Sequence, residues 1–334
     1  MKILIATGIY PPDIGGPAEY AKHLEDEFVA LGHTVSVVSY SGLERRLPFG
    51  LRHLVYFFRI FVQSFGSELI VTLDTFSVAL PAVIASVILR KKNIIRVSGD
   101  FLWESYVERT GELVPLRLFY KEKRNLNFKE KIIFRMMKFA LSKASLLAFN
   151  SEWQKDILVP AYNLDFSKVR TVFNFFGDSL PASEPQGKNI IWATRPIKLK
   201  NGKMLRSAFA KARESDPSLL LDERVTSHEE LFFRLASCYA VILPSISEVS
   251  PNFIIDAIRF GKPFIMTRES GLADILKDVG LLVNPLDESD ITEKILMLAN
   301  SSCYAKQKKL VEAFNFRHSW REIASEFLEL YKKI

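Results

Sequence analysis

The sequence predicts an α/β protein of two domains, each with a parallel sheet covered by helices. The length of 334 residues exceeds one ordinary core and suits two, since typical domains hold about 100–200 residues. Apolar runs of strand length alternate with segments of helical periodicity in both halves, as in a doubly wound sheet. A loosely patterned stretch over 177–188, with two prolines and two glycines, separates the halves. We therefore predict domains over 1–178 and 179–317 and a closing helix over 318–334.

The first half has the clearest elements. Its first helix is marked by Pro17 at a starting position and by Gly32 as its stop. The strands of this half are expected at 2–6, 34–38, 69–73, 94–97 and 145–149. Its helices are expected at 17–31, 51–65, 77–89, 129–143 and 152–158.

The second half repeats the alternation in a shorter form. Between the helix that ends near Glu214 and the segment that starts at His228, only 219–221 has the character of a strand. The other strands are expected at 189–193, 240–243, 263–266 and 280–283. The closing helix has four apolar residues at helical spacing: Trp320, Ile323, Phe327 and Leu330.

The composition, 48% hydrophobic and 25% charged, excludes a disordered, collagen-like or disulfide-scaffold chain. The two cysteines, Cys238 and Cys303, lie far apart in apolar-periodic segments, which indicates reduced thiols and a cytoplasmic location. Residues 1–7 lack the length and cleavage site of a signal peptide. The longest apolar stretch, 75–89, falls short of the roughly 20 residues that span a bilayer. We expect any membrane contact to be peripheral, at the inner face.

The net charge of +7 is concentrated in one place. Between Pro115 and Lys143 there are nine Lys or Arg against two Glu. Such a segment indicates an anionic partner, such as a lipid surface, a phosphorylated acceptor or nucleic acid. Lys131, Arg135 and Lys138 form a basic stripe beside apolar residues, which is typical of an interfacial helix but also of a helix that packs on a domain core. No nucleic-acid-binding motif accompanies the charge, so we expect no nucleic acid partner.

Three loops that follow predicted strands have side chains suited to chemistry. After the first strand, Gly15 and Gly16 precede Pro17, and such a turn either lets a ligand approach the backbone or simply joins strand to helix. After the strand at 189–193, Arg195 and Lys200 can converge on a diphosphate, or they belong to a solvated basic loop.

The third loop follows the strand at 240–243. Glu248 lies where the carboxyl ends of strands face the ligand crevice of a doubly wound sheet. Asp256 comes two turns later on the helix that borders that crevice, and the alternative for it is a surface carboxylate. Both carboxylates can accept hydrogen bonds from sugar or ribose hydroxyls.

In order and spacing, these sites resemble family 4 of the retaining glycosyltransferases of GT-B fold, over nearly the whole chain. The Pro-Pro-x-x-Gly-Gly-Pro opening is similar to the family's glycine loop, and Arg195 and Lys200 match its paired cations. Glu248 falls on the first Glu of its Glu-x7-Glu motif. The stretches 150–153 and 316–331 resemble its Ser-led helix start and its closing aromatic helix.

The resemblance implies two Rossmann-like domains across a cleft, with the closing helix returning to the first. It also implies transfer from a nucleotide diphosphate sugar to a glycan or lipid-linked acceptor, with retention, no metal and no cofactor. Arg195 and Lys200 would hold the donor's pyrophosphate, Glu248 the sugar and Asp256 the ribose. The remaining donor-binding residues would be Gly15, Gly16, Ser250 and Asn252. Asp100, after the strand at 94–97, would be an acid/base or positioning group, with Glu104 as its rival.

The sequence departs from the family pattern at three points. The second motif Glu is Asp256, the usual glycines after Glu248 are replaced by 249–251, and a βα unit is missing between Glu214 and His228. These departures leave a second reading open, a non-catalytic subunit of the same fold that binds sugar or nucleotide in a glycan-assembly complex. A nucleotide-sugar epimerase is a third, but the sequence has no His cluster to support it.

Overall fold

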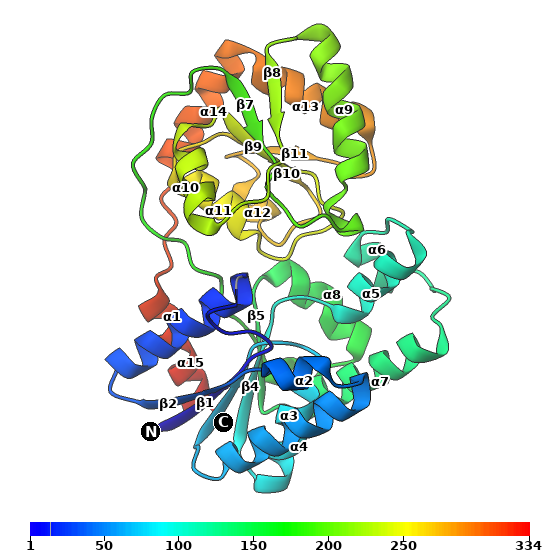
Figure 1. Cartoon of the computed structure of the whole chain (residues 1–334), viewed down its shortest axis with the longest axis vertical. Coiled ribbons are helices and arrows are strands. Elements are labelled where there is room, and N and C mark those ends of the chain that lie inside the picture. The colour runs from blue at the N-terminus through cyan, green and yellow to red at the C-terminus, as the bar shows by residue number, and fades with distance from the viewer. Residues whose placement is uncertain (14) are drawn as a thin grey trace. The chain divides into compact units, whose positions relative to one another are not determined.

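The computed structural model describes residues 1–13 and 15–334. The chain divides into two compact units, each with its own parallel sheet (Figure 1). Unit 1 comprises Met1–Leu102, Asn125–Phe175 and His318–Ile334, and unit 2 comprises Trp103–Arg124 and Phe176–Arg317. The units thus differ from the predicted domains. The sequence assigned 103–124 to the first domain, whereas its contacts group it with the second.

The sheet of unit 1 has the order β2-β1-β3-β4-β5-β6, with every strand parallel to its neighbours. The strands are β1 (Lys2–Ala6), β2 (Thr34–Val38), β3 (Leu69–Thr72), β4 (Lys92–Val97), β5 (Leu146–Phe149) and β6 (Val169–Thr171). The helices are α1 (Gly16–Ala30), α2 (Gly42–Arg46), α3 (Phe49–Ser64), α4 (Ala79–Leu89), α7 (Phe128–Lys143), α8 (Glu152–Tyr162), the 3₁₀ turn η1 (Phe166–Lys168) and α15 (Trp320–Lys332).

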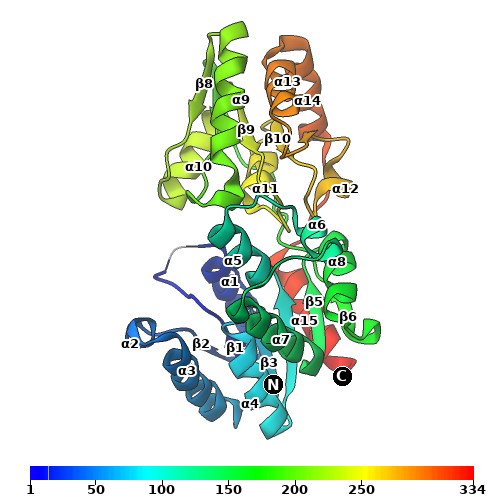
Figure 2. The same ribbon diagram turned by 90° about the vertical axis from the view of Figure 1, so that its right-hand side faces the viewer.

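Helices cover both faces of this sheet, which explains why β1 is a continuous apolar run. Successive side chains of a strand point to opposite faces. Ile3 and Ile5 therefore pack with the helices α1 and α15, while Leu4 packs with α3 and α4 on the other side. Figures 1 and 2 show these two helical layers. The closing helix α15 begins with a capping box of Ser319 and Glu322, and its apolar face belongs to the core of unit 1.

The sheet of unit 2 has the order β11-β10-β9-β7-β8, again all parallel. The strands are β7 (Lys188–Ile191), β8 (Leu219–Asp222), β9 (Ala240–Leu243), β10 (Phe264–Thr267) and β11 (Leu281–Val283). The helices are α6 (Leu116–Lys121), the 3₁₀ turn η2 (Lys198–Lys200), α9 (Gly202–Ser215), α10 (His228–Ser237), α11 (Asn252–Arg259), α12 (Ala273–Leu276), α13 (Glu288–Ala299) and α14 (Ser301–Ala313). The helix α5 (Phe101–Thr110) lies in unit 2 except for its first two residues.

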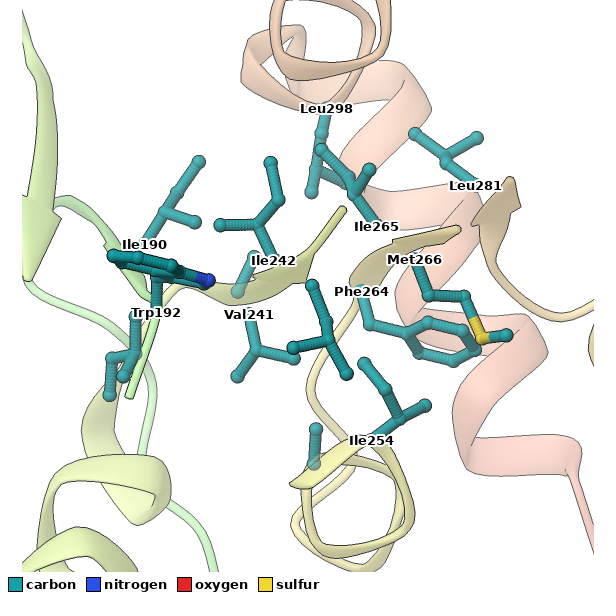
Figure 3. Packing of buried hydrophobic residues seen from close by; sticks show 14 of the residues in the cluster. Ile190, Trp192, Val241, Ile242, Ile254, Phe264, Ile265, Met266, Leu281 and Leu298 are labelled. Atoms are coloured by element: carbon teal, nitrogen blue, oxygen red, sulfur yellow. The ribbon is translucent and has the colours of Figure 1, made fainter. Parts of the chain in front are cut away.

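The core of unit 2 lies between this sheet and its helices. Ile242 and Ile265, from adjacent central strands, contact Leu298 of α13 and its neighbours, and Phe264 packs near Ile254 of α11 (Figure 3). Between α9 and α10 the described chain has the single strand β8, as the sequence predicted. Among the described residues, no helix is both long enough and apolar enough to cross a membrane.

Candidate functional site

The strand order of unit 2 identifies where a ligand would bind. From β7 the chain turns to β8 on one side, and it then returns to β9 on the other side of β7. In a doubly wound sheet, the two loops at such a switch point run in opposite directions from the carboxyl ends of their strands. A crevice that can bind a ligand lies between them. The loop after β7 carries Arg195 and Lys200, and the loop after β9 carries Glu248. The predicted residues therefore flank the switch point.

Lys200 and Glu248 form an ion pair across this switch point. The side chains are 19% and 13% exposed, so the pair is partly shielded from water. The backbone holds Glu248 in place: its N–H donates to the carbonyl of Glu269 at 2.9 Å, and its carbonyl accepts from Gly271 at 2.9 Å. The loops after β7, β9 and β10 thus meet at one residue, Glu248, which contacts the first through its carboxylate and the last through its backbone.

Asn201 links the loop after β11 to the same place and adds a second bond to the loop after β9. It takes the left-handed conformation, with φ +57°, which Asn tolerates better than most residues. Its Nδ2 donates to the carbonyls of Pro244 at 3.1 Å and Pro285 at 2.7 Å, on the loops after β9 and β11. Sequence reasoning missed this residue, although an Asn between a strand and a helix is a signal for such a turn.

The first turn of α9 faces the candidate site without a side-chain cap. A helix start of this kind presents backbone N–H groups and a partial positive charge to an anion. Gly202, its first residue, lies against the buried ring of Trp192: a Cβ there would come within 2.4 Å of Cη2. Only glycine brings the backbone this close to the indole.

The other predicted donor-binding residues of unit 2 differ in their surroundings. Arg195 is exposed, and within the described residues its guanidinium makes no ion pair. Ser250 is half-buried and Asn252 is exposed, at the start of α11. The N-cap of α11 is Pro251, whose side chain cannot accept a hydrogen bond. The structure therefore joins Lys200 to Glu248 and places Arg195 on the same loop as Lys200.

Asp256 is engaged elsewhere. Its carboxylate pairs with Arg259, one turn further along α11, at 3.2 Å. Arg259 also donates to the carbonyl of Asp178 at 3.2 Å. Burial raises the pKa of Asp256, and the charge of Arg259 opposes that rise. The role of Asp256 toward a ribose stays a prediction. For that role the carboxylate would have to bind the ribose and Arg259 together, or give up its ion pair with Arg259.

A carboxylate that the sequence analysis did not single out, Glu269, lies beside Glu248 after β10. One of its oxygens, Oε2, is buried and has no hydrogen-bond partner in the part of the chain that the structure describes. Burial raises the pKa of Glu269, and the charges of Arg117 and Arg268 oppose this. The position of Glu269 at the carboxyl end of a parallel strand was the signal that could have identified it.

Residues 103–124 support this site from an unexpected part of the chain. The Leu116 N–H donates to the buried Oγ of Ser247 at 3.0 Å, and Lys198 Nζ donates to the Glu108 carbonyl at 2.6 Å. The basic segment 115–143, predicted as one surface, is consequently divided between the units: 115–124 lie in unit 2 and 125–143 in unit 1.

In unit 1, Gly15 caps α1 with φ +151°, a backbone conformation that favours glycine, and Gly16 is the first residue of that helix. Asp100 follows β4 and is 1% exposed. It accepts a hydrogen bond from the buried hydroxyl of Tyr162 at 3.1 Å. A carboxylate enclosed in this way is suited to hold the Tyr162 hydroxyl in place. Its predicted acid/base role would require a route to solvent or substrate.

The described residues contain no group of three or more His, Cys, Asp or Glu side chains arranged to hold a metal ion.

Solved structures similar to this chain establish its architecture. Sucrose-phosphate synthase from Thermosynechococcus elongatus superposes with a TM-score of 0.71 at 16% identity, covering 99% of this chain and 98% of the other. Anabaena HepE in complex with UDP superposes with a TM-score of 0.68 at 14% identity over the whole of both chains. The chain has the GT-B fold. The fold class predicted from the sequence is therefore confirmed.

Sequence comparisons match parts of this GT-B chain, and the family model matches the part that carries the candidate site. The family model described as glycosyl transferases group 1 matches residues 201–301, and thus α9, Glu248 and Glu269. Sucrose-phosphate synthase 4 of Arabidopsis thaliana is 34% identical over 90 residues. An uncharacterized glycosyltransferase of Methanocaldococcus jannaschii is 29% identical over 113 residues. The matches cover 26% and 32% of this chain, but only 9% and 32% of those two proteins. They show sequence similarity to glycosyltransferases over part of the chain, and assignment to family 4 stays a prediction.

Proposed function

We propose that this chain is a glycosyltransferase that moves a sugar from a nucleotide diphosphate sugar to a glycan or lipid-linked acceptor. The observation that carries the proposal is the pairing of Lys200 with Glu248 at the switch point of unit 2. A cation for phosphate and a carboxylate for hydroxyls lie together where a doubly wound sheet receives its ligand. The group 1 match over 201–301 supports the same assignment.

In this proposal the phosphates of the donor lie between the α9 start and the cations of the preceding loop. Lys200 contributes a point charge and Arg195 a planar fork that suits phosphate oxygens. When the bond from the anomeric carbon to the diphosphate breaks, negative charge grows on the leaving phosphate. Cations fixed beforehand at that place stabilise the transition state more than the bound donor.

Glu248 orients the sugar by accepting hydrogen bonds from its hydroxyls. Because backbone hydrogen bonds fix both its N–H and its carbonyl, the carboxylate needs little reordering when the donor binds. Lys200 and the donor would share this carboxylate, since an ionised carboxylate has two oxygens with about four acceptor sites. Ser250 and Asn252, at the start of α11, and Gly15 and Gly16 in unit 1 are proposed as further donor contacts.

The finer chemistry is proposed from the family resemblance. From that resemblance we infer retention at the anomeric carbon. We also infer transfer without a metal ion, because Arg195, Lys200 and the α9 start supply positive charge to the diphosphate. Two measurements test this: NMR of the anomeric proton in the first product formed, and transfer rates in EDTA. An inverted product would overturn the first inference, and loss of transfer that Mg²⁺ restores would overturn the second.

Donor binding is tested most directly by thermal shift with a panel of nucleotide sugars. UDP-glucose belongs in the panel because HepE, a chain of similar fold, has been solved with it. A matching nucleotide sugar at 100 times its Kd stabilises the wild type by about 2.7 kcal/mol. The double variant Arg195→Ala with Lys200→Ala should lose this shift, whereas Lys203→Ala, an exposed cation on α9, should keep it. Equal shifts in all three proteins would remove the proposed phosphate site.

A non-catalytic subunit of the same fold is the second candidate. The observation in its favour is the short second sheet, in which β8 alone stands between α9 and α10 in the described chain. Such a subunit would bind nucleotide without consuming nucleotide sugar. Release of free nucleotide from a bound donor, with or without an acceptor, would therefore exclude it.

A further inference from the structure

An apolar and basic surface on unit 1 lies outside the proposed donor site. It is formed by the solvent-facing sides of α3, α4 and α7, which we call the α3–α4–α7 face. These helices cover the same side of the first sheet, with α3 packed on α4 and α4 on α7 (Figures 1 and 2). All three belong to unit 1.

The outer side of α3 carries a continuous apolar stripe. Its members recur at intervals of three or four residues, which puts them on one side of a helix. They are Leu51, Leu54, Phe58, Val62 and, at the end of the helix, Phe65, each between 48% and 65% exposed. The core of unit 1 is already served by other residues of this helix, Tyr56 and Ile60, which are fully buried. The stripe is therefore not needed for packing within the unit.

The neighbouring helices extend this apolar surface. Of the 18 large hydrophobic side chains found exposed in the described chain, ten belong to α3, α4 and α7 or to Phe65, which follows α3. Those of the last two helices are Val87, Ile88, Phe128, Met136 and Phe139. A concentration of this kind on one side of a unit is unusual for a surface exposed only to water, and it marks an interaction site.

The same face is strongly basic. Residues 49–64, 79–92 and 128–143 contain ten Lys and Arg and one acidic residue, Glu130, which is buried. The whole chain has 45 Lys and Arg and 38 Asp and Glu, so the remainder has 35 and 37, a net charge of −2. The net positive charge of this chain thus lies on these three helices and on the three residues that follow α4, Arg90, Lys91 and Lys92. Lys131, Arg135 and Lys138 are exposed beside Met136 and Phe139 on α7.

Apolar side chains with surrounding cations and no exposed carboxylate match the interface of an anionic bilayer. The apolar stripe would enter the boundary between headgroups and acyl chains, and the cations would meet lipid phosphates. We propose that the α3–α4–α7 face docks this chain on an anionic phospholipid membrane. This surface differs from the predicted segment 115–143: it excludes 115–124 and includes α3, whose apolar stripe supplies the part that inserts.

Vesicle flotation tests the proposal with the full chain and lipids of defined charge. The wild type should float with vesicles containing 30% phosphatidylglycerol and remain in solution with pure phosphatidylcholine. Raising the salt from about 0.05 to 0.5 M should weaken the binding, since salt screens surface charges. Lys131→Gln with Arg135→Gln and Lys138→Gln should weaken partition roughly 100-fold, because each cation near an anionic surface contributes about fivefold.

The apolar stripe is tested separately. Phe58→Gln with Val62→Gln should weaken partition by at least about tenfold. The matched control is Leu220→Gln with Phe233→Gln, a pair on unit 2 that is equally or more exposed and should float like the wild type. Circular dichroism and urea midpoints show whether each variant is folded.

Three outcomes would overturn the proposal. The wild type could fail to float with anionic vesicles at low salt, or the α3 pair could affect flotation no more than the control pair. Alternatively, the wild type could self-associate with rising concentration while the α3 pair stays monomeric, which would assign the face to a second copy of this chain. Because partition is measured without nucleotide, failure here leaves the proposed transfer activity untouched, and the reverse also holds.

Discussion

The ion pair between Lys200 and Glu248 permits a quantitative test of the candidate site. Lys200→Met keeps most of the side-chain length and removes the charge, which leaves a carboxylate that is 13% exposed without its cation. Removing one partner of a hydrogen-bonded charged pair costs about 1–3 kcal/mol, because the other partner stays desolvated. Glu248→Gln likewise leaves the Lys200 ammonium group partly buried without its carboxylate. The double variant should therefore be more stable than the sum of the single losses predicts.

The coupling can be measured by a double-mutant cycle on urea unfolding midpoints, followed by tryptophan fluorescence. Residues in direct contact show interaction energies of about 0.5–3 kcal/mol, and we expect about 1–2 kcal/mol for this pair. A coupling below about 0.3 kcal/mol would mean that the pair is not formed in solution, and the description of the switch point given above would fail.

The same variants separate phosphate from sugar recognition. Lys200→Met should weaken a nucleoside diphosphate and its sugar conjugate alike, by about 10- to 100-fold, since a hydrogen bond to a charged group contributes about 1.5–3 kcal/mol. Glu248→Gln should weaken the sugar conjugate more than the free nucleotide. Isothermal titration calorimetry with UDP and UDP-glucose measures both. If Glu248→Gln affected UDP and UDP-glucose equally, its assignment to the sugar would be wrong.

Three further predictions concern stability and the first unit. His318 is buried, and burial lowers its pKa, but the hydrogen bond and charge of Glu326 outweigh this and raise the pKa above the usual value. The wild type should thus lose stability as pH rises from about 6.5 through the raised pKa, and urea midpoints of Glu326→Gln should show less of this loss. Gly202→Ala should destabilise by about 1–3 kcal/mol, since its Cβ would meet the Trp192 ring, and thermal melts that match the wild type would contradict that contact. Asp100→Asn should lower kcat less than tenfold while reducing stability; a loss above 100-fold in a fully stable variant would favour the acid/base role.

The fold could be predicted because its signals are local. Strands such as β1 and β9 are short apolar runs buried on both faces, and their predicted bounds match those observed. The single strand β8 between α9 and α10 was also predicted, and the observed strand is one residue longer at its end than the predicted one. The strand β6, with three residues, was missed because so short a run has no measurable period.

Within the candidate site, the predictable residues were those that directly follow a predicted strand. Arg195, Lys200 and Glu248 each follow a strand, and parallel strands bring their carboxyl ends to one edge. The grouping of 103–124 with unit 2 was not predictable, because it depends on contacts between distant residues, such as the Leu116 N–H with Ser247 Oγ. The ion pair between Asp256 and Arg259 was not predicted either, although Arg259 lies only one helical turn away.

The assignment of 103–124 to unit 2 affects how related chains can be recombined. The backbone passes from one unit to the other after residues 102, 124, 175 and 317, so neither unit is a single stretch of gene. A chimera that exchanges only 179–317 to change sugar preference would replace Ser247 and Lys198 and leave their partners, Leu116 and Glu108, facing foreign residues. Exchanging 103–124 together with 176–317 would keep those partners matched.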